Sequence, residues 1–340
     1  MTSDILLPYI IYVIINFPIF FLTTILAKYL NLLDIPGGRK IHTELVPYTG
    51  GIALSICLLL SLPMYPLIPK ELSLIISFGF IVSLVGLLDD KLNLGAGNKI
   101  VLQIIPILLL LFVDINSMSL NTLGEYGFFN LDLGTFAIPF TLFGVLLLIN
   151  TFNYFDGLDG SLTSTSLVVL IILFFLSPDE NVRLYLLIII STLIIFLFFN
   201  FSIFKLPKMF LGDSGSLTMG FIIAFILIYF ANQNIAHPIV LAWSVALFVY
   251  EFLSINILRI KNKENLFKGG NDHLHHLLYK HTRSIFLTNF LMALIQIVFF
   301  IMGYLTFVFL SPFYSLIFFI LFFINFFFIR RAYKYFLSSM

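Results

Sequence analysis

The chain has 340 residues, of which 60% are hydrophobic and 10% are charged, and its formal net charge is +1. Soluble globular proteins carry charge on roughly a quarter of their residues, so this composition excludes an ordinary soluble protein. The near-neutral balance gives no reason to expect a nucleic-acid partner.

Apolar segments recur along the whole chain, and we expect eleven of them to be membrane-spanning helices. They do not alternate as barrel strands do, so helices are favoured over a barrel. The expected spans are 6–27, 48–67, 72–88, 99–113, 136–152, 162–178, 183–201, 215–231, 238–258, 286–310 and 313–329. Only Ser311 and Pro312 separate the last two, which leaves ten spans as the alternative. The expected fold is an all-α polytopic transmembrane bundle, a single integral-membrane domain over residues 1–340.

The basic residues are distributed unevenly between the two sides of this bundle. All but two of the 18 Lys and Arg residues, Lys70 and Arg183, fall on the side reached after each odd-numbered span. Cytoplasmic loops collect Lys and Arg, so the N-terminus is predicted outside and the C-terminus in the cytoplasm. Ten spans would place Arg330 and Arg331 outside. Those two residues and Lys334 are expected to have no role beyond orienting the protein.

Two of the cytoplasmic loops combine charge with glycine or with a helix end. The first holds Lys40 and His42 and leads to Gly50-Gly51 at a helix start. Exposed N–H groups there favour an anionic ligand, although basic residues are expected in any cytoplasmic loop. The second holds Asp89-Asp90 at the inner end of a span. Adjacent carboxylates oppose the helix dipole, which favours a catalytic or metal-binding role over a solvated helix end.

The third loop has the most specific pattern. Asn150, Asn153, Asp156 and Asp159 follow one another in three-residue steps, which would place four oxygen ligands along one side of a helical turn and its exit. No Glu closes a twelve-residue calcium-binding loop. The fourth loop places Asp213 directly before a span, as a helix N-cap, a metal ligand or both.

The fifth loop carries three histidines in four positions, His273, His275 and His276. No cysteine or second ligand cluster with zinc-like spacing accompanies them, so phosphate or nucleotide binding is favoured over zinc. Together the five loops supply carboxylates, amides, bases and glycines. This is the inventory for metal-assisted phosphoryl transfer.

With these motifs in this order, the chain resembles the polyprenyl-phosphate N-acetylhexosamine-1-phosphate transferase family, of the MraY, WecA and TagO type. The resemblance covers essentially the whole chain and rests on Asp89-Asp90, the block 150–160, the stretch 211–215 and the motif His-Leu-His-His at 273–276. It implies transfer of N-acetylhexosamine-1-phosphate, with N-acetylglucosamine the expected sugar, from a UDP-sugar to undecaprenyl phosphate. UMP would be released, with Mg²⁺ or Mn²⁺ as cofactor.

The resemblance also implies roles for individual residues. Asp213 is the expected main metal ligand, with Asn153 or Asp156 beside it. The expected catalytic carboxylates are Asp89, Asp90 and Asp156, the first two near the lipid phosphate. The expected substrate-binding residues are Lys40, His42, Lys99, Asn150, Asp159, His273, His275 and His276. The enzyme would act at the cytoplasmic face of the cell membrane and initiate cell-envelope glycan synthesis, and a homodimer is left open.

Two alternatives remain at this stage. A phospho-N-acetylmuramoyl-pentapeptide transferase shares the chemistry, but His-Leu-His-His replaces the His-His-His-Phe of those enzymes and favours the WecA and TagO type. Tyr48 stands where relatives often carry Arg, which reduces the basic character of the first loop. A membrane transporter is the alternative from another class. It is disfavoured because Glu251 is the one Asp, Glu, Lys or Arg residue in the middle of an expected span.

Overall fold

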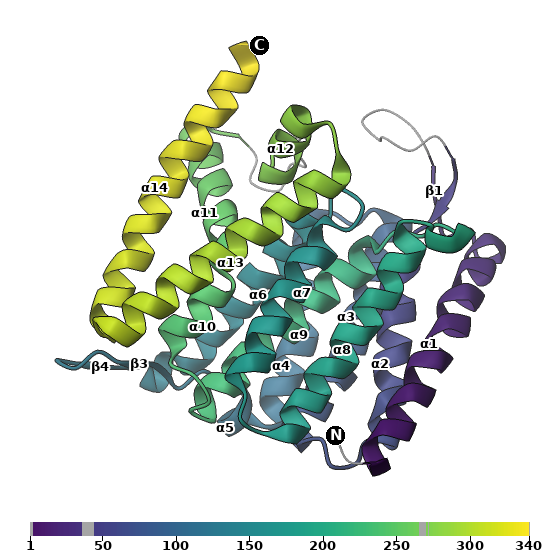
Figure 1. Ribbon diagram of the computed structural model, residues 1–340, viewed down its shortest axis with the longest axis horizontal. Coiled ribbons are helices and arrows are strands. Elements are labelled where there is room, and N and C mark those ends of the chain that lie inside the picture. Colours follow the sequence, from purple (N-terminus) through teal and green to yellow (C-terminus); the bar gives the residue numbers. More distant parts are fainter. Residues whose placement is uncertain (1–2, 36–43, 265–269, 271, 340) are drawn as a thin grey trace.

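The structure is a computed structural model, and it describes residues 3–35, 44–264, 270 and 272–339. Its long or apolar helices are α1 (Ser3–Tyr29), α2 (Gly50–Met64), α3 (Lys70–Leu92), α4 (Ala96–Val113), α6 (Ala137–Phe155), α7 (Ser161–Leu176), α8 (Glu180–Asn200), α9 (Gly212–Asn232), α10 (Pro238–Ser244), α11 (Ala246–Lys261), α13 (Ile285–Phe309) and α14 (Pro312–Ser339). Two further helices, α5 (Ile115–Met118) and α12 (Leu274–Thr282), lie between them (Figure 1). The strands form two short antiparallel pairs, β1 (Leu33–Asp34) with β2 (Val46–Pro47) and β3 (Thr122–Glu125) with β4 (Asn130–Asp132).

The expected all-α polytopic bundle is confirmed. Within the described residues, 8 helices are long and apolar enough to cross a membrane, or 9 if α10 and α11 form one span, and α2 and α7 are shorter apolar helices. Each expected span overlaps one of these helices or the α10–α11 pair. The number of crossings and the orientation of the termini stay predictions.

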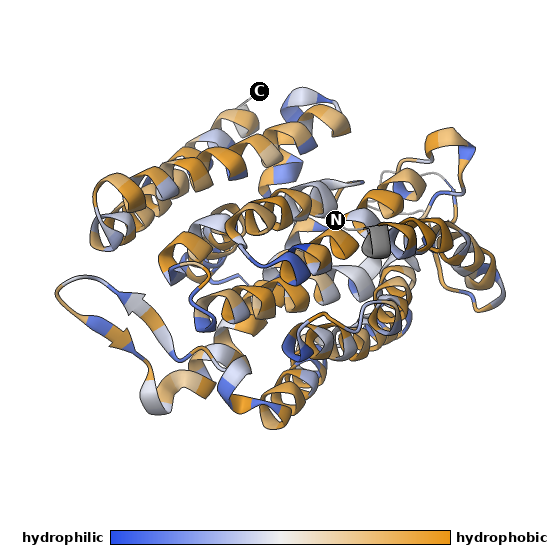
Figure 2. Ribbon diagram, turned by 60° about the horizontal axis from the view of Figure 1, so that its bottom comes forward, coloured by the Kyte–Doolittle hydropathy of each residue, from blue (hydrophilic) through white to orange (hydrophobic). Residues whose placement is uncertain are grey.

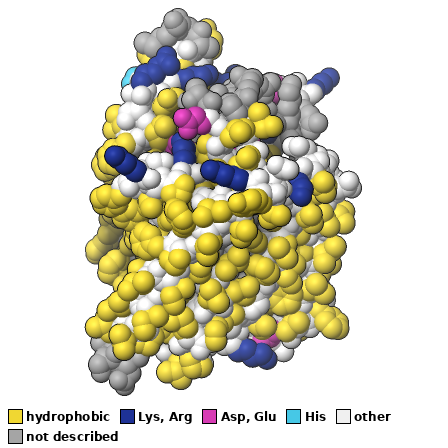
Figure 3. All heavy atoms as spheres, turned by 90° about the vertical axis from the view of Figure 1, so that its right-hand side faces the viewer, with side chains coloured by type: hydrophobic (Ala, Val, Ile, Leu, Met, Phe, Trp, Pro, Cys, Tyr) yellow, Lys and Arg dark blue, Asp and Glu magenta, His cyan; other side chains and the backbone are white. Residues whose placement is uncertain are grey.

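Apolar side chains cover the middle of the bundle. Figure 2 shows hydrophobic residues along most of each long helix and hydrophilic ones mainly at helix ends and in connections. In Figure 3 a hydrophobic band crosses the exposed face, and Lys and Arg side chains gather along its upper edge. The N- and C-terminal ends lie at opposite ends of the bundle, with α12 and β1 at the same end as the C-terminus (Figure 1). The protein thus presents a belt suited to lipid, with polar ends.

Helix α9 lies at the centre of the bundle and is buried along its whole apolar length. It packs against α2, α3 and α6. The crossing with α2 is so close that a Cβ on Gly51 would overlap the backbone of Gly215. The N–H groups of Gly50 and Gly51 donate to the carbonyls of Phe210 (3.0 Å) and Leu211 (2.9 Å). This glycine pair therefore packs and pins the start of α9, which corrects the expectation that its N–H groups face an anion.

The ninth expected span is not one straight helix, because α10 and α11 meet at 74°. No proline or glycine stands at the break, and the side chain of Gln296 from α13 occupies it. Gln296 Nε2 donates to the carbonyls of Trp243 (3.0 Å) and Ser244 (2.8 Å), and its Oε1 accepts the N–H of Leu247 at 3.0 Å. A backbone break inside lipid is stable only when its freed polar groups find partners, and one glutamine supplies three.

The orientation can be tested with reporter fusions. A reporter fused after Met340 is expected to read cytoplasmic, because the cations gather at that end of the bundle. A reporter inserted between Gly127 and Phe128, in the β3–β4 connection, is expected to read outside. If both reporters read the same side, the chain crosses the membrane an even number of times between these two points, and the eleven-span topology is wrong.

Candidate active site

The start of α9 carries Asp213 and is held by a carboxylate from α3. Asp90 accepts the N–H of Asp213 through Oδ1 (3.1 Å) and the N–H of Ser214 through Oδ2 (3.3 Å). The first N–H groups of a helix have no partner within it, so Asp90 caps α9 from a neighbouring helix. Asp213 lies inside the first turn, and Leu211 occupies the N-cap position. The prediction that Asp213 is itself the N-cap is therefore wrong, and its carboxylate is free to face other groups.

Gly212 makes this arrangement possible. Its φ is +72°, in the left-handed region that disfavours any residue with a Cβ. A Cβ at this position would lie 2.7 Å from Asp90 Oδ2 and 2.8 Å from the carbonyl oxygen of Tyr48. Both the turn into α9 and the approach of Asp90 therefore require glycine.

Lys99, from the first turn of α4, joins the carboxylates of two helices. Its Nζ lies 2.6 Å from Asp89 Oδ2 and 2.5 Å from Asp213 Oδ2. Asn153 donates through Nδ2 to Asp213 Oδ1 at 2.7 Å, and its own Oδ1 lies 3.5 Å from Lys99 Nζ. The second oxygen of Asp89 accepts the N–H of Leu94 at 3.0 Å. The structure thus brings together Asp89, Lys99, Asn153 and Asp213, which the sequence separates by up to 124 positions (89 to 213).

The asparagine and aspartate steps at the end of α6 do not all face the same way. Asp156 and Asp159 line the same cavity as Asp213. Asp159 also forms an ion pair with Lys208 at 2.6 Å. Asn150 lies about one helical turn before Asn153 in α6. Its side chain donates to Gln103 Oε1 (3.0 Å) and to a backbone carbonyl in its own helix. Its side chain takes part in a contact between α4 and α6, and its substrate-binding role stays a prediction.

The cavity has a volume of about 730 Å³ and strongly acidic walls. Its carboxylates are those of Asp34, Asp89, Asp90, Asp156, Asp159 and Asp213. Lys208 is the cation among the described lining residues, and Lys99 reaches two of the carboxylates from outside the lining set. Negative charge is therefore in excess, which suits a divalent cation and its phosphate ligands.

The pKa of Asp156 reflects this excess of negative charge. Burial, together with the nearby charges of Asp213 and Asp159, raises the pKa of its carboxyl to about 8. A divalent cation at this point would relieve the same repulsion. The oxygen donors of Asp213, Asn153 and Asp156 fit Mg²⁺, which takes few protein carboxylates and completes its shell with water and substrate phosphates. Within the described residues, no group of three or more His, Cys, Asp or Glu side chains is placed to hold a metal ion, so the metal site stays a prediction.

The three histidines approach the cavity from α12. His276 lines it, and the imidazole of His275 lies where a Cβ of Gly157 would be. Burial lowers the pKa of His273 to about 3 and also lowers the pKa of His276, so both imidazoles are neutral near pH 7. Neutral imidazole offers one donor and one acceptor. These residues would meet a ligand through hydrogen bonds more than through charge. Lys40 and His42 lie outside the described residues.

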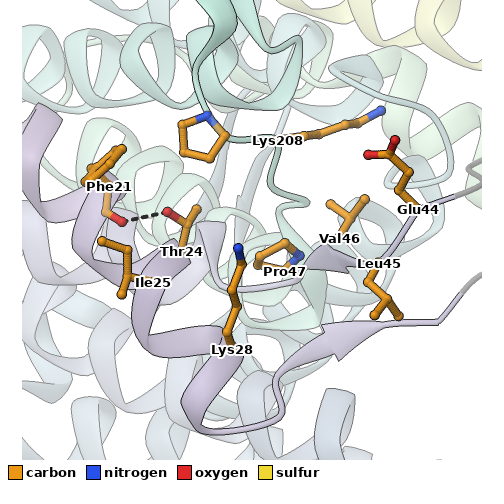
Figure 4. A pocket seen from close by; sticks show the side chains of 10 residues that line it. Phe21, Thr24, Ile25, Lys28, Glu44, Leu45, Val46, Pro47 and Lys208 are labelled. Atoms are coloured by element: carbon orange, nitrogen blue, oxygen red, sulfur yellow. Dashed lines mark hydrogen bonds between the residues drawn. The ribbon is translucent and has the colours of Figure 1, made fainter.

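A second cavity, of about 510 Å³, lies beside α1 and the β1–β2 pair. Figure 4 shows Lys28 extending from α1 beside Pro47, with Phe21 and Ile25 on the same helix. Lys208 lines both cavities. Sequence reasoning did not select Lys208 as a site residue. The signal was available, since it is a cation three positions before the predicted stretch 211–215.

The sequence matches the family model described as Glycosyl transferase family 4 over residues 72–231. This range contains the acidic pair, the block 150–160 and Asp213. The predicted resemblance is confirmed. The chain is 27% identical over 270 residues to an undecaprenyl-phosphate alpha-N-acetylglucosaminyl 1-phosphate transferase of Salmonella typhi, with 76% of this chain and 72% of the relative covered.

Two further relatives have the same kind of name. The undecaprenyl-phosphate alpha-N-acetylglucosaminyl 1-phosphate transferase of Escherichia coli strain K12 is 28% identical over 265 residues, covering 75% of this chain and 71% of the relative. The probable undecaprenyl-phosphate N-acetylglucosaminyl 1-phosphate transferase of Bacillus subtilis is 29% identical over 269 residues, covering 74% and 71%. These similarities extend well beyond the range of the family model.

The requirement for glycine at the start of α9 can be tested by substitution. Gly212→Ala puts a residue with a Cβ in the left-handed region, which costs about 1–2 kcal/mol. It also places that Cβ against the carboxylate of Asp90. We expect the variant to lose most of its transferase turnover while still inserting in the membrane, measured as UMP release per folded protein. Gly97→Ala is the matched control, because a Cβ on Gly97 has nothing within 4 Å. Equal turnover in the two variants would show that the geometry at Gly212 is dispensable.

Proposed function

We propose that this protein transfers N-acetylglucosamine-1-phosphate from a UDP-sugar to undecaprenyl phosphate, giving the lipid-linked diphosphate sugar and UMP. The observation that carries the proposal is the ammonium of Lys99 held between Asp89 and Asp213 at an oxygen-lined cavity. Phosphoryl transfer needs cations, oxygen ligands and fixed positions more than covalent chemistry. The names of the relatives support the choice of sugar and lipid.

Each part of the site has a task in this reaction. Mg²⁺ or Mn²⁺, held by Asp213, Asn153 and Asp156, would neutralise phosphate charge when bound. Lys99 directs a positive charge at the same point and keeps Asp89 and Asp213 at a fixed separation. Asp90 fixes the first turn of α9 and, through it, the direction of the Asp213 carboxylate.

The remaining residues would bind the donor. His276 at the cavity wall can donate a hydrogen bond to a diphosphate oxygen, and Asp159 with Lys208 borders the same space. The site lies at the end of the bundle where the cations gather, which supports a cytoplasmic active site in the cell membrane (Figure 3). A UDP-sugar would reach it from water and the lipid phosphate from the bilayer. The product would be the first lipid-linked intermediate of a cell-envelope glycan.

Turnover with a panel of donors tests the proposal. Purified protein with undecaprenyl phosphate is expected to release UMP from UDP-N-acetylglucosamine, to stop when EDTA is added, and to recover with Mg²⁺. Lys99→Met and Asp213→Asn are expected to lower the rate by about 100-fold or more, since the first removes a positive charge near the reacting phosphates and the second removes the charge of the expected metal ligand. UMP release is measured by chromatography.

The control for these variants is Asp132→Asn, an exposed carboxylate in β4 at the opposite end of the bundle, which is expected to keep the wild-type rate. Faster turnover of UDP-N-acetylmuramoyl-pentapeptide than of UDP-N-acetylglucosamine would replace the proposed donor by the alternative one. Absence of UMP release with every donor would remove the proposed function.

We favour direct displacement over a covalent enzyme intermediate. A lipid phosphate oxygen would bond to the β-phosphorus, and the bond from that phosphorus to the bridging oxygen would break as UMP leaves. A phosphate monoester with a second pKa of about 6 is mostly dianionic at neutral pH, so it needs little help from a base. Protein incubated with UDP-N-acetylglucosamine alone is expected to keep its mass in intact-protein mass spectrometry. A phospho-sugar adduct on Asp89 or Asp156 would establish the two-step route instead.

A further inference from the structure

An ion pair lies buried between α11 and α14. Arg330 Nε donates to Glu251 Oε2 at 2.6 Å, and Arg330 Nη2 donates to Glu251 Oε1 at 3.0 Å. Both side chains are 1% exposed. Arg330 was expected to serve only the topology of the chain, and this contact corrects that expectation.

The same two side chains also hold the backbone at the start of α12. Glu251 Oε1 accepts the N–H of Leu274 at 2.8 Å, and Arg330 Nη2 donates to the carbonyl of Asp272 at 2.6 Å. The carboxylate of Asp272 meets Lys334 of α14 at 3.0 Å and Arg259 of α11 at 3.8 Å. The pair therefore holds the backbone by hydrogen bonds on both sides of His273.

That short stretch leads directly into the active-site cavity. The ring of His273 is tilted by 57° to that of Tyr154, with 5.1 Å between the ring centroids, and His275 lies against Gly157. His276 reaches the cavity wall beside Asp156. A shift at residues 272–274 would consequently move all three imidazoles relative to the carboxylates on α6 and α9.

We propose that Glu251 and Arg330 are positioning residues, which act through the backbone of residues 272–274 to place the histidines at the donor side of the cavity. The proposal rests on the proposed transferase function. A buried ion pair is a poor source of stability, because desolvation offsets the attraction and an apolar pair of similar volume often serves as well. Here the pair also supplies an acceptor and a donor to backbone groups that no apolar pair could satisfy. The last helix of the chain is thereby part of the active-site support.

The double variant Glu251→Leu with Arg330→Met separates positioning from stability. Removing one partner leaves a buried charge, whereas replacing both restores an apolar contact. The double variant is expected to fold and insert in the membrane, so that its turnover can be compared per folded protein. Its turnover is expected to fall about 10- to 100-fold, as misplaced groups cause even when the change lies away from the chemistry. Wild-type turnover in a folded double variant would overturn the proposal.

A double-mutant cycle with His276→Ala tests whether the pair acts through the histidines. If it does, replacing the pair lowers turnover less than about threefold in a protein that already carries His276→Ala. If the loss of turnover in the pair variant and the loss in His276→Ala multiply instead, the pair acts elsewhere and the proposal is overturned. Arg331→Gln, at the neighbouring exposed position, is the matched control and is expected to keep the wild-type rate.

Hydrogen exchange gives a readout that does not depend on turnover. Peptides covering residues 272–282 are expected to exchange faster in the double variant, and peptides from α9 are expected to be unchanged. Should the wild type release no UMP, the transferase function fails while this measurement still reports on the pair. Unchanged exchange over 272–282 would overturn the positioning role whatever the activity.

Discussion

The ammonium of Lys99 shared by Asp89 and Asp213 is the contact on which the site depends. It joins the start of α4, which carries the lysine, to the end of α3 and the first turn of α9, which carry the two aspartates. Carboxylates placed this close repel one another and would otherwise take up protons or move apart. One shared cation lets Asp89 and Asp213 stay charged and close. The cavity can then present oxygen ligands in fixed positions.

The burial of α9 makes that contact rigid. Because the helix is enclosed along its whole length, its first turn cannot move without disturbing α2, α3 and α6 together. Asp90 and Gly212 then set how the chain enters this turn. The two adjacent aspartates of the acidic pair thus have different tasks. Asp89 meets the ammonium of Lys99, and Asp90 meets the backbone that carries Asp213.

The sequence predicted at which end of the bundle the site residues lie better than it predicted which side chains they contact. The succession of apolar segments and polar loops, with the uneven distribution of Lys and Arg, predicts Asp89, Asp156 and Asp213 at one end of the bundle. In the structure all three line one cavity. Which side chains touch depends on the rotation and tilt of each helix, and packing between helices sets these, which hydropathy does not reveal. Asn150 therefore faces Gln103 although its spacing matches that of Asp156. The 74° break after α10 could not be read from the sequence either, since Gln296, which satisfies its backbone groups, lies far along the chain in α13.

Three polar side chains in this bundle satisfy backbone groups where a neighbouring helix begins or breaks. Asp90 does so at the start of α9, Gln296 between α10 and α11, and Glu251 at the start of α12. Lipid offers no water to these N–H and C=O groups, so a partner from a neighbouring helix is the remaining way to stop a helix within the bundle. Two of these three places, the starts of α9 and α12, bring Asp213 and His276 to the active-site cavity.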